Sequence, residues 1–115
     1  MKNIRVYFDK NSELYEKQEM IEVRKEAHKK IAGHKEYDFK KGFKYDEKDY
    51  IDVDWVIQKL EECKGRCINC GCNLQCSKIK ASDGEQFSID RLDNKIAHTK
   101  DNCHVICWNC NRTQK

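Results

Sequence analysis

Apolar and polar residues follow a helical spacing in the first third of the chain. Residues 4–8 are rich in β-branched and aromatic residues and are followed by turn-prone residues, which predicts a strand. Ser12 can then cap a helix that continues to about Ala32, with Gly33 as its stop. The apolar residues that recur along it are Leu14, Ile21, Ala27 and Ile31. This stripe is narrow, so the helix must pack against another element.

Residues 34–50 interleave lysines with aromatic residues. Basic and aromatic side chains together could contact a nucleic-acid strand. The simpler interpretation, which we favour, is a connecting loop whose aromatic residues cover the core. The aromatic residues concerned are Tyr37, Phe39, Phe43 and Tyr45.

A second helix is predicted from Trp55 to about Cys63. Asp52 or Asp54 can cap its first turn, and Trp55, Val56 and Leu60 share one face. The composition changes after Gly65, and all eight cysteines lie at or beyond Cys63. We therefore divide the chain into an N-terminal extension, residues 1–50, and a module, residues 51–115.

The module continues as a hairpin followed by a helix. Apolar residues alternate from Phe87 to Arg91 as in a strand, and the turn residues Asp93 and Asn94 follow. Residues 103–106 form a second extended run. A helix can begin beside the last cysteine pair and carry Asn111 on its first or second turn.

Composition favours a metal-stabilised fold. Hydrophobic residues make up 38% of the chain and charged residues 37%, so the apolar core is small for 115 residues. The first residues contain no apolar run and no window suits a membrane span, so we expect a cytoplasmic or nuclear protein that is not secreted. Paired cysteines in such a reducing compartment indicate metal ligands rather than disulfides. The net charge of +3 does not by itself indicate nucleic acid as a partner.

Two cysteine pairs have the spacing of a zinc site. Cys67 and Cys70 form one pair, and Cys107 and Cys110 form the other. Two intervening residues let both thiolates of a pair reach one tetrahedral ion, and four thiolates close its coordination shell. The pattern predicts a structural Zn²⁺ site. Free buried cysteines or a redox dithiol are the alternatives.

The other four cysteines are irregularly spaced. A second zinc site could use them, with Cys72 and Cys76 as one arm. Small buried thiols beside the first site are the interpretation we favour. The four residues are Cys63, Cys72, Cys76 and Cys103.

The run SIDRLDN followed by TKDNCHVICWNCNR resembles the zinc-bearing branch of the HNH nucleases, also called His-Me finger or ββα-metal nucleases, a group that includes phage endonuclease VII. The resemblance covers about residues 63–115. It implies an α+β fold, in which a zinc-stapled ββα-metal module follows a mainly helical extension. It also implies a metal-dependent endonuclease that hydrolyses phosphodiester bonds in nucleic acid, with DNA as the expected substrate.

The resemblance assigns roles to three residues. Asp90 matches the family's metal-binding aspartate, and Asn111, directly after Cys110, matches the last ligand of the catalytic ion. Asn102 matches the middle asparagine, whose side chain is expected to hold the loop by hydrogen bonds to the backbone. Carboxylate and amide oxygens suit Mg²⁺ or Mn²⁺ as the catalytic ion.

Arg91 stands where the family has its general-base histidine. Arginine stays protonated and cannot accept a proton from water. Arg91 could instead grip the substrate phosphate while His98 or His104 serves as the base. Alternatively, metal-bound water attacks with little help from a base, which gives a slower enzyme. In a third interpretation the module binds nucleic acid or protein without cleavage. An aspartate followed by an arginine also occurs in phage and viral sequences of this type, so we favour activity.

Overall fold

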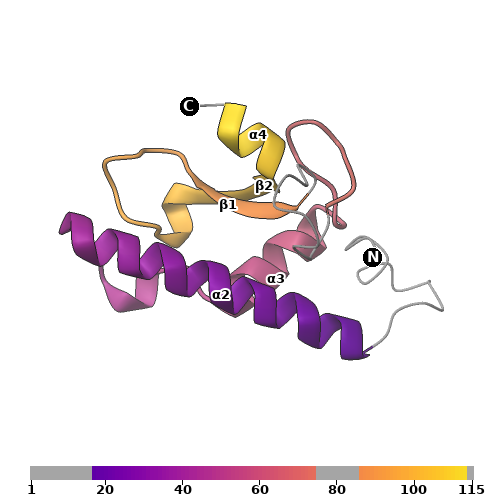
Figure 1. The fold of residues 1–115 in the computed structure, drawn as a ribbon, viewed down its shortest axis with the longest axis horizontal. Coiled ribbons are helices and arrows are strands. Elements are labelled where there is room, and N and C mark those ends of the chain that lie inside the picture. Colours follow the sequence, from indigo (N-terminus) through magenta and orange to yellow (C-terminus); the bar gives the residue numbers. More distant parts are fainter. Residues whose placement is uncertain (1–16, 75–85, 114–115) are drawn as a thin grey trace.

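The computed structural model describes residues 17–74 and 86–113, with side chains from residue 21 onward. The strand expected at residues 4–8, Leu14 and Cys76 lie outside these residues. Figure 1 shows the long helix α2 on one side of a two-stranded hairpin and the short helix α4 on the other. The elements in chain order are α2 (Lys17–Lys41), η1 (Glu47–Asp49), α3 (Val53–Glu62), β1 (Phe87–Arg91), η2 (Lys100–Asn102), β2 (Cys103–Cys107) and α4 (Trp108–Thr113).

Helix α2 passes through Gly33 and ends at Lys41, so the stop predicted at Gly33 is wrong, as is the loop predicted for its last turns. A glycine inside a helix costs about 1 kcal/mol relative to alanine. Contacts made by the turns after Gly33 offset this cost. The fully buried Asp38 accepts hydrogen bonds from Tyr50 and from the backbone of His98. Gly42 follows the last helical residue, and its φ of +75° and hydrogen bonds are typical of a glycine at a helix C-terminus.

Helix α3 agrees with its prediction. The carboxylate of Asp52 accepts a hydrogen bond from the backbone N–H of Trp55 at 2.8 Å, as an N-cap does. Trp55, Val56 and Leu60 are all buried against the rest of the core. The carbonyl of Leu60 accepts from the N–H of Gly65, which ends the helix close to the predicted residue.

Strands β1 and β2 pair antiparallel, as the alternating pattern predicts. Phe87 lies opposite Cys107, and Asp90 lies opposite His104. Because side chains alternate along a strand, Ser88 and Asp90 point to one face of the hairpin, and Phe87 and its alternate neighbours point to the other. Helix α4 contacts both strands and brings Asn111 to the hairpin.

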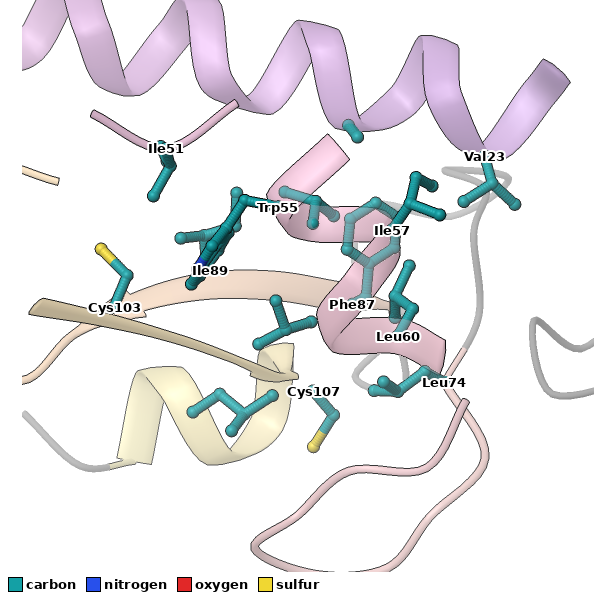
Figure 2. Close-up of a cluster of buried hydrophobic side chains, with 14 of the residues drawn as sticks. Val23, Ile51, Trp55, Ile57, Leu60, Leu74, Phe87, Ile89, Cys103 and Cys107 are labelled. Carbon is teal, nitrogen blue, oxygen red and sulfur yellow. The ribbon is translucent and has the colours of Figure 1, made fainter. Parts of the chain in front are cut away.

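The core lies between α2, α3 and the hairpin (Figure 2). Val23 and Ala27 of α2 are fully buried there, whereas Ile21 is exposed. Residues from the extension and from the module therefore share one core. Within the described residues, no helix is long and apolar enough to cross a membrane. The largest fully buried apolar side chains are Phe87, Leu60, Leu74, Ile89, Ile106, Val23 and Val56.

Candidate functional site

Four cysteine sulfurs gather at the base of the hairpin. All of them lie within 4.8 Å of one another. The Sγ atoms of Cys67 and Cys110 are 3.9 Å apart, and those of Cys70 and Cys107 are 3.7 Å apart. These are the four cysteines that the spacing selects, and together they could hold a metal ion such as zinc. They are the one such group of His, Cys, Asp or Glu side chains in the described part of the chain.

Backbone N–H groups point to two of the sulfurs in this cluster. The N–H of Cys107 points to the sulfur of Cys67 at 3.4 Å, and the N–H of Cys110 points to the sulfur of Cys107 at 3.4 Å. Gly71, with φ of +78°, closes the turn after the first pair. Hydrogen bonds from the backbone and side chain of Cys72 lower the pKa of Cys70 to about 7. The lowered pKa values of Cys67 and Cys70 favour the charged form that binds metal, whereas burial raises the pKa values of the Cys107 and Cys110 thiols.

The remaining described cysteines stay outside the metal group. Cys103 is buried, and Cys63 and Cys72 are partly buried against the hydrophobic core. Burial, and next the carboxylate of Asp38, raise the pKa of the Cys103 thiol to about 12, so it is neutral at pH 7. Their packing agrees with the interpretation of these three as small buried residues.

A second polar site lies on the face of the hairpin that carries Asp90. The Nε2 atom of His104 lies 2.9 Å from an Oδ atom of Asp90, directly across the two strands. The Asp90 side chain is 7% exposed and the His104 side chain 23%. A nearly buried carboxylate is thus held by an imidazole that solvent can reach.

Asn111 reaches the same face from the first turns of α4. Its side-chain amide donates to Oγ of Ser88 at 3.1 Å, and that hydroxyl donates to the carbonyl of Ile106. The Oδ1 atom of Asn111 is buried, and among the described residues it has no hydrogen-bond partner. Ser88 is two residues from Asp90, so this amide oxygen lies on the face that carries the Asp90–His104 pair.

No family model, no curated protein and no solved structure matches this chain. The site itself consists of a group of four thiols, an aspartate hydrogen-bonded to a histidine, and a buried amide oxygen.

Asn102 holds the loop between the two strands. Its side-chain amide donates to the carbonyls of Asp93 at 3.0 Å and Ala97 at 3.1 Å, and its Oδ1 accepts from the N–H of Asp93 at 2.9 Å. The side chain is buried, so each of these bonds replaces contact with water. The family resemblance implies a loop-holding role for Asn102, and these hydrogen bonds agree with it.

Arg91, expected to contact the substrate phosphate, is hydrogen-bonded within the protein. Its guanidinium donates to the carbonyls of Asn94 at 3.1 Å and Ile96 at 3.2 Å. It also lies over the rings of Tyr37 and Phe43. As the neighbour of Asp90 on β1, it points to the opposite face of the hairpin. We therefore leave Arg91 out of the proposed site.

His98 belongs to a buried cluster instead of the Asp90 face. Its side chain is 5% exposed, and its Nδ1 lies 2.8 Å from Oδ2 of Asp38. The same oxygen accepts from the backbone N–H of His98 and from the hydroxyl of Tyr50. Burial alone raises the pKa of Asp38, but these hydrogen bonds bring it below its ordinary value. His98 ties α2 to the loop before β2, so we do not retain it as a candidate base.

His34 stacks on His98 with their ring centres 4.1 Å apart. Burial, and next the proximity of His98, lower the pKa of His34 to about 4. Sequence reasoning missed His34 and Asp38, because both lie in a stretch assigned to a loop or its edge. A helix continued to Lys41 places them on one face, one turn apart, and that spacing is the signal that could have found them.

Proposed function

We propose that this protein is a metal-dependent endonuclease of the HNH type, which hydrolyses phosphodiester bonds in DNA. The observation that carries the proposal is the common face of the hairpin shared by Asp90, His104 and Asn111, fastened at its base by four cysteines. The order of strand, loop, strand and helix agrees with the sequence resemblance to that family.

In this proposal the four cysteines bind a structural Zn²⁺ ion. Zinc–thiolate bonds of about 2.3 Å in a tetrahedron place the sulfurs about 3.8 Å apart. The Sγ separations of the Cys67–Cys110 and Cys70–Cys107 pairs, 3.9 and 3.7 Å, fit that value. Such an ion would join the turn at Cys67 to the start of α4 and so help to fix Asn111 relative to β1.

Asp90 and Asn111 would hold the catalytic Mg²⁺ or Mn²⁺. An Asn111 oxygen that is buried without a partner fits this role, because a buried acceptor is costly unless something binds it. It is one of three buried side-chain atoms in this state among the described residues. A bound divalent ion would neutralise charge on the scissile phosphate and on the departing oxygen.

His104 would act as the general base, the role that the family gives to the histidine after the aspartate. With Nε2 donating to Asp90, its Nδ1 would be available to accept a proton from water. Its side chain is 23% exposed, so water can reach the ring. His98 and Arg91 are bonded to other groups, which is why we assign this role to His104.

Plasmid cleavage tests the proposal. The zinc-loaded protein should nick supercoiled DNA with Mg²⁺ or Mn²⁺, and Asp90→Ala and Asn111→Ala should lower the rate at least a hundredfold. Asp101→Ala is the matched control, since Asp101 is an exposed carboxylate in η2. Zinc content must be equal in all samples. Cleavage that survives both site variants would refute the assignment.

A zinc-stapled module that binds nucleic acid or protein without cleavage is the second candidate. The position of Arg91 favours it, because the residue that follows the aspartate is bonded to loop carbonyls and offers no base. Binding of DNA with no cleavage in Mg²⁺, Mn²⁺ or Co²⁺ would select this function over the first.

A further inference from the structure

A hollow of about 230 Å³ opens along the edge of β1, between α2 and α4. Figure 1 shows these two helices on opposite sides of the hairpin. Asn111 and Ser88 line the hollow, so it adjoins the proposed catalytic site. Residues of α2 line its other wall, and this helix has no part in the family resemblance. The polar and aromatic residues that line it include Lys29, Lys30, His34, Ser88, Trp108 and Asn111.

The α2 wall of the hollow is basic. Lys29 is exposed, and the ammonium of Lys30 lies over the ring of Phe87 while it pairs with Glu26 at 3.4 Å. No carboxylate is among the described residues that line the hollow. Its charge is therefore complementary to an anion, and an exposed lysine is a common partner of a phosphate.

Trp108 brings an exposed aromatic ring to the opposite wall. The residue is 42% exposed, whereas Trp55 is 7% exposed. The backbone N–H of Trp108 donates to the carbonyl of Gln86 at 2.8 Å, which fixes the start of α4. A large aromatic side chain left in solvent next to lysines is the arrangement on which unpaired bases stack.

His34 contributes a neutral polar ring between these walls. Burial and the neighbouring His98 keep its pKa near 4, so it is uncharged at pH 7. Its stacking on His98 holds the ring in one orientation. The hollow thus combines a cationic side, an aromatic side and neutral hydrogen-bonding groups.

We propose that this hollow binds one nucleotide of an unpaired strand, with its base on Trp108 and its phosphate at Lys29. The inference rests on the proposed function, because it takes the nucleotide to be part of the nuclease substrate. A base stacked inside intact duplex presents no free face to Trp108. The substrate class is therefore single-stranded nucleic acid, or an unpaired stretch of a branched duplex.

Binding of oligothymidylate to the full-length, zinc-loaded protein tests this without added divalent metal. Tryptophan fluorescence should be quenched by an eight-nucleotide strand, and a blunt hairpin duplex of equal charge should bind more weakly. Trp108→Ala should weaken binding about tenfold and remove the quenching. Lys29→Glu should also weaken strand binding about tenfold. Lys29→Ala should reduce the slope of log binding constant against log salt concentration by about 0.7, as expected for the loss of one phosphate contact. Phe39→Ala and Lys40→Ala, exposed residues of α2 outside the hollow, should bind like the wild type.

The result that overturns the inference is wild-type affinity in both Trp108→Ala and Lys29→Glu, or equal affinity for the duplex without quenching. Lys29→Glu alters an exposed helical surface, so loss of fold does not explain a change in that variant. Plasmid cleavage is scored separately. A protein that binds the strand but never cleaves removes the nuclease proposal alone, and one that cleaves while both variants bind normally removes this inference alone.

Discussion

The imidazole of His104 lies 2.9 Å from the carboxylate of Asp90, directly opposite it across the β1–β2 hairpin. The pairing follows from register, because a slip by one residue would turn His104 to the other face of the hairpin. Cys107, one of the four clustered cysteines, ends β2 opposite Phe87, so a metal ion bound to the cluster would help to fix that register. We therefore expect metal binding by the four cysteines to help position the proposed catalytic pair.

Replacement of His104 by glutamine should weaken the hold on Asp90 and remove the proton acceptor. We expect the Mn²⁺ concentration for half-maximal cleavage to rise about 10- to 100-fold, with a lower maximal rate as well. Metal titrations of plasmid nicking measure both quantities. His28→Gln, on an exposed part of α2, is the matched control. A His104 variant with an unchanged metal dependence would contradict the role given to this residue.

Removal of zinc should unfold the C-terminal half. Zinc binding in four-cysteine sites contributes on the order of 10 kcal/mol to folding. We therefore expect Cys110→Ser, or a strong chelator, to abolish the cooperative thermal transition seen by circular dichroism. Cys63→Ser lies outside the metal group and should keep one zinc per chain by mass spectrometry. A chelated protein that melts like the untreated one would count against a structural ion.

Asn102→Ala should lower the free energy of unfolding by about 3 kcal/mol, because three short hydrogen bonds are lost and their backbone partners stay partly buried. Urea denaturation at constant zinc measures the change. Asn94→Ala, an exposed residue of the same loop, should change stability by less than about 0.5 kcal/mol. Equal stability of the two variants would show that the Asn102 bonds do not hold the loop.

His34 should make folding sensitive to acid. Its folded pKa is about 4 against 6.5 for the free residue, so the unfolded chain binds more protons between these values. Stability should therefore fall as the pH drops from 6.5 toward 4, with a slope of up to about 1.4 kcal/mol per pH unit from this residue. The contribution of His34 is the difference in unfolding free energy between the wild type and His34→Gln, measured as a function of pH. Acid loss of zinc affects both proteins and cancels in this difference. A difference independent of pH would contradict the lowered pKa of the partly buried His34.

The module could be predicted well because its signals are local. Asp52 caps α3 as expected, the alternation from Phe87 to Arg91 forms β1, and the cysteine spacing selects four sulfurs that meet in the structure. A cap, a strand pattern and a metal turn each depend on a few neighbouring residues. These features need no knowledge of distant contacts.

The extension of α2 could not be predicted, because its cause is not local. In the sequence, Gly33 predicts a helix stop. The contacts that stabilise the helix beyond Gly33 join Asp38 to Tyr50 and His98, which are 12 and 60 residues away. A fully buried aspartate looks like a surface residue in the sequence. The same limit applies to Arg91, whose partners are loop carbonyls fixed only once the loop has folded.

Anomalous diffraction from crystals of the zinc-loaded protein soaked in Mn²⁺ tests the central claim most directly. The account predicts a zinc peak among the sulfurs of the four cysteines, and a separate manganese peak bonded to Asp90 and to Oδ1 of Asn111. A manganese peak that is absent from this face, or that lies away from both side chains, would contradict it.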